Sequence, residues 1–203
     1  MAEELIRGLR RFRREAFPRY REHFERLVAE GQSPRTLFIG CSDSRVLPDL
    51  LVDAGPGDLF VARNVGAFVP PFDPDDGEHG TGAVIEYAVQ VLEVAEIVVC
   101  GHSHCGAVRA LYEPPDVDAP NLERWLRHGR EARVEGPVDE PLLRRTERRS
   151  IALQVGRLTG YPPIRERVEA GRLALHGWHY LIGEGRVEAL DVERGAFAPL
   201  EEG

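Results

Sequence analysis

The sequence contains no lysine, so all 26 of its basic residues are arginine. We interpret this as the codon bias of a GC-rich genome rather than adaptation to heat, because Arg-for-Lys exchange is seen in only some heat-adapted families. Apolar runs of about 18 residues are also missing, which argues against a membrane-spanning helix. The N-terminus is charged from Glu3 onward and lacks the apolar core of a secretory signal. We therefore expect a cytoplasmic protein.

The sequence also lacks a positive charge balance, since its 34 acidic residues give a net charge of −8. Such a chain is poorly suited to bind nucleic acid or an anionic membrane, and we expect neither as a partner. A length of 203 residues supports one good-sized core and is short for two. We predict a single domain over residues 1–203, in which residues 1–31 form an N-terminal helical arm.

The spacing of apolar residues changes along the chain. Residues 3–30 place apolar side chains every three or four positions, which predicts helix, and Pro18 should end or kink the first part near Phe17. Three short, apolar, β-rich segments follow, as is typical of a parallel sheet covered on both faces. These segments are residues 36–40, 58–62 and 96–101.

Helical patterns surround these strands. One pattern, over residues 82–93, joins the second strand to the third and predicts a right-handed crossover. The end of the chain predicts a β-hairpin, with strands at 173–182 and 186–191. The fold class is α/β: a central, mostly parallel sheet flanked by helices, with the N-terminal arm and the C-terminal hairpin added. Other helical patterns cover 105–112, 121–130, 140–160 and 163–170, and loops cover 70–80 and 113–120.

Two clusters of reactive side chains directly follow predicted strands. The first is Cys41-Ser42-Asp43-Ser44-Arg45, and the second is residues 101–106, Gly-His-Ser-His-Cys-Gly. The carboxyl ends of parallel strands are where α/β sheets bind ligands. If the two strands are neighbours, their ends lie about 5 Å apart.

The cysteines and histidines of these clusters suit a metal. Three cysteines without a secretory signal do not indicate disulfides. Cys41, His102 and Cys105 offer two thiolates and an imidazole, a combination known in catalytic zinc sites, where a fourth position stays open for water. The start of a helix should favour the Cys105 thiolate. His104 remains an alternative ligand.

Asp43 and Arg45 lie beside the first of these ligands. An Asp held by an adjacent Arg stays ionised and oriented. It could then accept a hydrogen bond from a zinc-bound hydroxide. The alternative is a surface ion pair that caps the next turn.

Both clusters, in this order and spacing, resemble the zinc motifs of the β-class carbonic anhydrases. Residues 57–66, 80–89 and 177–180 resemble that family as well, so the likeness spans about residues 31–190. The resemblance implies a zinc lyase (carbonate dehydratase), which hydrates carbon dioxide reversibly to bicarbonate and a proton by means of a zinc-bound hydroxide. It also implies one zinc per subunit on Cys41, His102 and Cys105, with Asp43 and Arg45 as the catalytic dyad.

The resemblance further implies a homodimer or a higher homo-oligomer. Gln32, Phe60 and Tyr87 match positions that line the substrate pocket of the plant-like subgroup, partly from the neighbouring subunit. In a second subgroup the Asp closes onto zinc, and a Trp helps to bind regulatory bicarbonate. Here Phe38 stands in place of that Trp, which together with Gln32 favours the plant-like, open subgroup. The sequence departs from the family at Ser150, where Asn is common.

Two other functions remain open at this stage. The same zinc framework could hydrolyse carbon disulfide or carbonyl sulfide, since substrate access cannot be read from one sequence. A non-enzymatic zinc protein would instead need a fourth protein ligand. Two thiolates cancel the charge of zinc formally, so we expect a less acidic water than in a three-His site and an activity that rises toward alkaline pH. The proton shuttle is left open between His104 and buffer.

Overall fold

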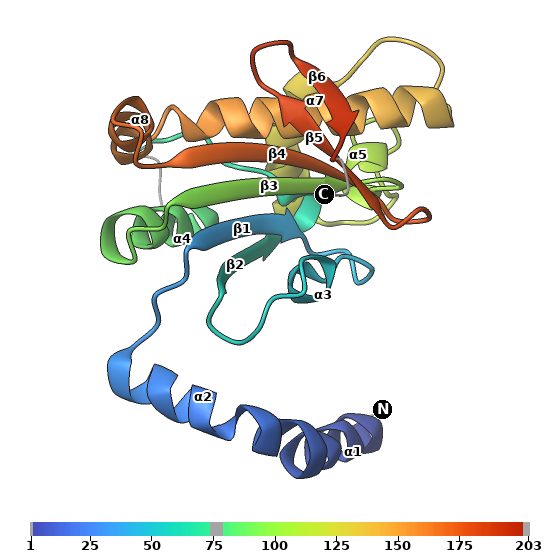
Figure 1. Cartoon of the computed structure of the whole chain (residues 1–203). Helices are drawn as coiled ribbons and strands as arrows, with labels where there is room; N and C mark the ends of the chain where they lie inside the picture. The colour runs from blue at the N-terminus through green and yellow to red at the C-terminus, as the bar shows by residue number, and fades with distance from the viewer. Residues whose placement is uncertain (1, 74–78, 201–203) are drawn as a thin grey trace.

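A computed structural model describes residues 2–73 and 79–200 of the chain (Figure 1). Its helical segments are α1 (Ala2–Arg11), η1 (Phe12–Ala16), α2 (Phe17–Glu30), α3 (Pro48–Leu51), η2 (Val65–Ala67), α4 (Gly80–Glu86), η3 (Tyr87–Val91), α5 (Gly106–Ala110), α6 (Pro120–Leu126), η4 (Arg127–Ala132), α7 (Glu140–Leu158) and α8 (Pro162–Glu169). Its strands are β1 (Thr36–Cys41), β2 (Leu59–Asn64), β3 (Glu96–His102), β4 (Ala174–Leu181), β5 (Arg186–Asp191) and β6 (Ala196–Pro199).

The six strands form one mixed sheet in the order β2-β1-β3-β4-β5-β6. β1 pairs in parallel with both β2 and β3, and β3 pairs in parallel with β4. The pairs β4–β5 and β5–β6 are antiparallel. The predicted α/β class and C-terminal hairpin are therefore confirmed. The sequence analysis missed β6, a strand of only four residues.

The two faces of the sheet carry different parts of the core because side chains alternate along each strand. Leu37 and Ile39 of β1 belong to the main core, which α7 and α8 also line. α7 packs directly against β3 and β4. Phe38 points to the other face, where it forms a smaller cluster with Val98 and Cys100.

The N-terminal arm extends away from the sheet on the side opposite α7 (Figure 1). No residue of α1, η1 or α2 is buried. The predicted interruption near Phe17 is present as the π-helical turn η1, which ends at Ala16. Pro18 lies in the first turn of α2, directly after η1, and lacks the N–H that would continue the helical hydrogen bonds.

The other helices differ from the predicted ranges mainly at their ends. The helix predicted over 82–93 begins at Gly80 and finishes as the π-helical turn η3. The predicted loop over 70–80 includes residues 74–78, which lie outside the described residues. Within the described ranges, no helix is both long and apolar enough to cross a membrane.

Candidate metal centre

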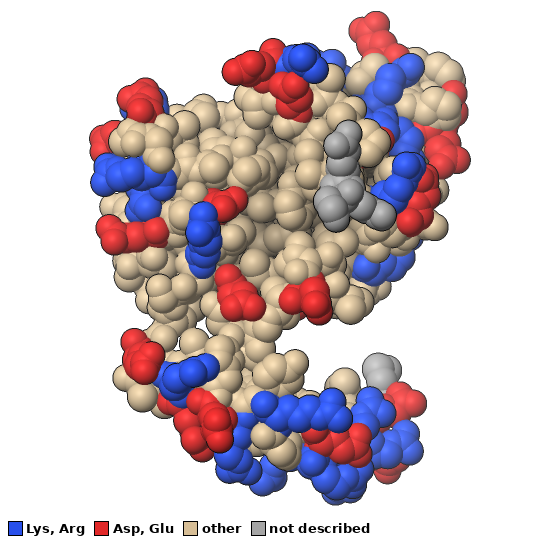
Figure 2. Space-filling view, in the orientation of Figure 1, with Lys and Arg blue, Asp and Glu red and all other residues tan. Residues whose placement is uncertain are grey.

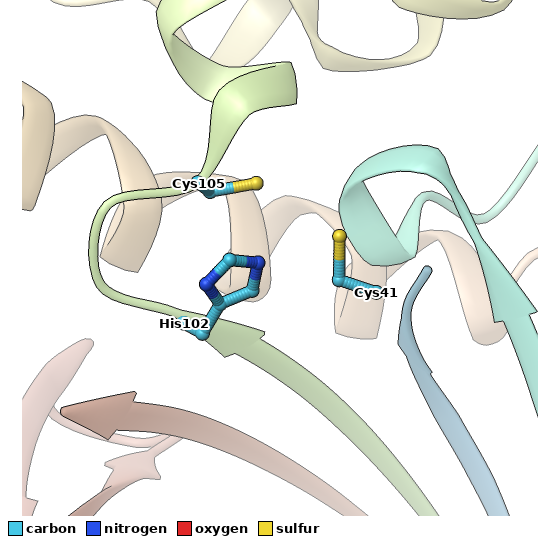
Figure 3. A group of neighbouring side chains, drawn as sticks. All are labelled: Cys41, His102 and Cys105. Atoms are coloured by element: carbon cyan, nitrogen blue, oxygen red, sulfur yellow. The ribbon is translucent and has the colours of Figure 1, made fainter. Parts of the chain in front are cut away.

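Cys41 and His102 lie at the carboxyl ends of two neighbouring strands, β1 and β3. Cys105 follows on the short loop after β3 and caps the start of α5. The three side chains converge (Figure 3). Their ligand atoms all lie within 4.8 Å of one another, and all three residues are buried. The predicted juxtaposition of the two strand ends is therefore present.

The His102 ring is arranged as a metal ligand would be. Its Nδ1 lies 2.9 Å from the carbonyl oxygen of Ser103, so Nδ1 carries the hydrogen and donates it. Nε2 then keeps a free lone pair, and this buried atom has no hydrogen-bond partner. A buried nitrogen without a partner is costly and calls for an explanation such as a metal. The donor set of two thiols and one imidazole fits zinc.

The two thiols have different environments. Backbone N–H groups of Asp43 and Gly66 donate to the Cys41 sulfur, each at 3.4 Å. A hydrogen bond from the Cys105 thiol, together with these amides, outweighs burial and lowers the pKa of Cys41 to about 4.

The Cys105 thiol changes in the opposite direction. Its hydrogen bond to Cys41, followed by burial, raises the pKa of Cys105 well above its ordinary value. The amides of Ala107 and Val108, at the start of α5, lower that pKa as the sequence analysis expected, but they are outweighed. A bound dication would supply the missing stabilisation, since a coordinating thiol loses its proton.

Asp43 and Arg45 form a tight pair at the rim of this group. Arg45 donates from Nε to Oδ1 at 2.9 Å and from Nη2 to Oδ2 at 2.7 Å. Its backbone N–H adds a third bond to Oδ1 at 3.0 Å. These hydrogen bonds hold the pKa of Asp43 well below its ordinary value, despite partial burial. The Asp43 carboxylate is thus ionised and oriented.

Further hydrogen bonds fix this rim. Arg45 Nη2 also donates to the carbonyl oxygen of His104 at 3.1 Å, which joins the two loops. Arg63 donates to the carbonyl oxygens of Cys41 and Asp43, at 3.0 and 2.7 Å. Asp43 Oδ2 lies 3.9 Å from His102 Nε2. Asp43 is nevertheless outside the group of metal-capable residues found in the described part of the chain.

Comparison with known proteins agrees with this geometry. The family model described as carbonic anhydrase matches residues 36–187. A carbonic anhydrase of Pseudomonas aeruginosa is 42% identical over 98% of this chain and 92% of its own length. The solved β-carbonic anhydrase CcaA superposes with a TM-score of 0.90 at 40% identity, covering 99% of this chain and 92% of that one. The chain belongs to the β-class carbonic anhydrases.

A further relative bears on assembly. One of two β-carbonic anhydrases described as tetrameric, from Sordaria macrospora, is 31% identical and has a TM-score of 0.79. The match covers 93% of this chain and 98% of that one. Related β-class enzymes of this fold thus form homo-oligomers.

The three predicted pocket residues of this family member do not join the metal-capable group within one chain. Phe60 is paired with Leu37, whereas Cys41 is paired with Asn64. Four residues of strand therefore separate Phe60 from the site edge, about 13 Å at 3.3 Å per residue. Tyr87 stacks on Phe60 with ring centroids 5.7 Å apart. Gln32 is exposed and lies before the start of β1, at the same remote end of the strand.

Other residues near the site were not predicted. Glu147 of α7 is buried and accepts a hydrogen bond from the backbone N–H of Cys105. His179 of β4 is buried next to it. The sequence analysis noted His179 only within residues 177–180, which resemble the family, and the charged residues around Glu147 did not indicate a buried carboxylate. Ser150, the noted departure from the family, is also buried on α7.

Proposed function

We propose that this protein is a zinc-dependent enzyme that interconverts carbon dioxide and bicarbonate. Cys41, His102 and Cys105 would hold one zinc ion per subunit. The observation that carries this proposal is the buried, unpartnered Nε2 of His102, which shares a site with two thiols. When bound, zinc supplies a water whose pKa is lowered enough to provide a nucleophile near neutral pH.

Asp43 and Arg45 would orient the reacting groups. Because the Asp43 carboxylate is ionised, it can accept a hydrogen bond and fix the direction of a lone pair on the attacking oxygen. Arg45 uses two donors to hold that carboxylate at the rim. This arrangement supports an open site, with the fourth position left to water, and so supports the plant-like subgroup.

We infer that the working form is a homodimer or a larger homo-oligomer. In one chain, Phe60 and Tyr87 stand at the end of the sheet remote from the metal-capable group, as expected if a pocket is completed by a second copy. The arm of residues 1–31 also leaves large apolar side chains exposed, among them Leu5, Leu9 and Val28. Sedimentation velocity should give a dimer or larger species, and a monomer with full activity would refute this inference.

Two measurements on the purified protein test the proposed activity. Elemental analysis should give one zinc per chain, and stopped-flow assays should show carbon dioxide hydration that rises toward alkaline pH. The same preparation should also be incubated with carbonyl sulfide, and the release of sulfide should be measured. Sulfide release without hydration of carbon dioxide would contradict the proposal.

A further inference from the structure

A network of polar side chains runs from the loop of Cys105 to the C-terminal part of the sheet. Glu147 and His179 in it are buried, and the other members are half-buried. Glu147 Oε1 accepts the backbone N–H of Cys105 at 3.1 Å. Its other oxygen, Oε2, accepts from Arg144 and lies 3.1 Å from Nε2 of His179. On the far side, His179 Nδ1 lies 3.1 Å from Glu188 Oε2. At the end of this network, Arg148 donates two hydrogen bonds to the Glu188 carboxylate, of 2.8 and 3.0 Å.

Two side chains of this network are more deeply buried than ionisable groups usually are. Glu147 is 2% exposed and His179 is fully buried. Both ring nitrogens of His179 lie 3.1 Å from carboxylate oxygens, one of Glu147 and one of Glu188. Glu147 Oε2 therefore meets both His179 and Arg144, and these two contacts hold its side chain in one orientation.

Stability alone does not account for these buried charges. Replacing a buried ion pair by apolar residues of similar volume is often neutral or stabilising. An apolar side chain at position 147 could join α7 to the sheet equally well. It could not accept the N–H of Cys105, which is the one contact of Glu147 that reaches the metal-capable group.

The loop held by this contact is strained. His104 has φ = +58°, a left-handed conformation that is unfavourable for a residue other than glycine and persists only where its surroundings enforce it. The residues on either side supply that constraint. The Ser103 N–H donates to the carbonyl oxygen of Tyr180 at 2.9 Å, and the Ser103 Oγ accepts from Ile182 N at 2.9 Å. Cys105 is held by Glu147.

We propose that Glu147, itself held by His179 and Arg144, is a positioning residue that fixes the Cys105 peptide so that its thiolate faces the site shared with Cys41 and His102. This inference rests on the proposed zinc site. It assigns Glu147 no contact with substrate. Groups that orient metal ligands from behind typically change metal affinity by 10- to 100-fold when they are removed.

The double variant Glu147→Leu/His179→Leu tests the proposal without leaving either partner as an unpaired buried charge. Arg144 can turn to Glu140, whose Oε1 lies 3.8 Å from its Nε. We expect a folded protein whose zinc affinity, measured by chelator competition, falls by about 10- to 100-fold. The cobalt-substituted form should show weaker thiolate-to-metal charge transfer. Affinity within about twofold of the parent, with the same cobalt spectrum, would overturn the proposal.

Two single variants refine the comparison. Glu147→Gln keeps an oxygen for the Cys105 N–H and should retain affinity within about threefold of the parent. Glu147→Asp keeps the charge for His179 but withdraws the oxygen by one methylene, and should weaken zinc binding. If the double variant does not fold, this Asp variant decides: parental affinity in a folded protein refutes the proposal.

Arg157→Met provides the matched control on the same helix. Arg157 donates to the carbonyl oxygens of Val69 and His128 and to the side chains of Gln154 and Glu131. Among the described residues it has no hydrogen bond to Cys41, His102 or Cys105, so its loss should lower stability while zinc affinity stays parental. If this variant lost zinc as strongly as the double variant, general destabilisation would explain both losses. The positioning role of Glu147 would then be refuted. A parent that binds no zinc would instead refute the proposed function itself.

Discussion

Replacing Gly66 with alanine should lower the stability of the protein and disturb the Cys41 thiol at the same time. Gly66 has φ = +88°, which an alanine adopts only with strain. A Cβ atom added there would lie 2.6 Å from Cζ of Phe68. Phe68 is fully buried, and its ring is also close to Gly129, where an added Cβ would again lie 2.6 Å from Cζ. The tip of the ring is therefore in close contact with both glycines and has little room to move.

The expected loss of folding free energy has two causes. A left-handed conformation costs an ordinary residue about 1–2 kcal/mol, and overpacking of a filled core typically costs about 1–3 kcal/mol. The sum is about 2–5 kcal/mol, which for a chain of this size lowers Tm by about 4–20 °C. Because the Gly66 N–H donates to the Cys41 sulfur, the backbone shift should also speed zinc release to a chelator.

Two control variants separate the strain of the backbone from the crowding of the Phe68 ring. Gly171→Ala tests the backbone alone, since Gly171 has φ = +65° and no atom within 4 Å of its added Cβ. Gly129→Ala tests crowding without a positive φ, since a Cβ added there would meet Phe68 at 2.6 Å and Leu111 at 3.0 Å. Thermal unfolding of the metal-free proteins at one concentration should give the largest loss for Gly66→Ala, and only that variant should release zinc faster. If Gly66→Ala cost no more than Gly171→Ala, the account of the confined ring would be wrong.

Three further predictions concern the site and the buried network. Cys41→Ala should abolish zinc binding in elemental analysis, because only two protein ligands remain. Asp43→Asn should keep zinc but slow stopped-flow hydration by about 10- to 100-fold, the equivalent of one charge-assisted hydrogen bond, and full activity would contradict its role. Burial tends to raise the pKa of Glu188, but hydrogen bonds from His179 and Arg148 lower it below its ordinary value of 4.5. The associated stability is complete above that value and is lost as pH falls through the lowered pKa. Urea midpoints should therefore drop below about pH 4.5, and less steeply in Glu188→Gln.

The parts of the fold that sequence predicted are those set by local pattern. Short apolar runs gave the parallel strands, and the reactive residues directly after two of them indicated a common edge. That inference needed only the neighbouring placement of β1 and β3, which the structure has. Three ligand atoms within 4.8 Å follow from it. The local Asp43–Arg45 pair was equally accessible, because two residues so close in sequence need no long-range packing to meet.

The parts that were missed depend on distant pairing. Glu147 meets Cys105 across 42 residues and meets His179 across 32, and neither separation follows any local period. Strand β6 has only four residues and ends in Pro199, so it is too short to show a strand pattern. Gly66 is one of 21 glycines, and only the packed Phe68 ring distinguishes it. Such features depend on how distant elements pack against each other, and the pattern of a single sequence does not show that packing.

The N-terminal arm and the body of the protein differ in surface charge. Basic side chains gather along the arm, whereas the visible face of the body mixes both signs (Figure 2). Residues 7–14 contain five arginines and no acidic residue, although the whole chain has a net charge of −8. An arm that projects from its own body, with exposed apolar side chains among its arginines, is suited to rest on the acidic body of another copy. If a second copy also lies against the sheet end that carries Phe60 and Tyr87, completion of the pocket would depend on assembly.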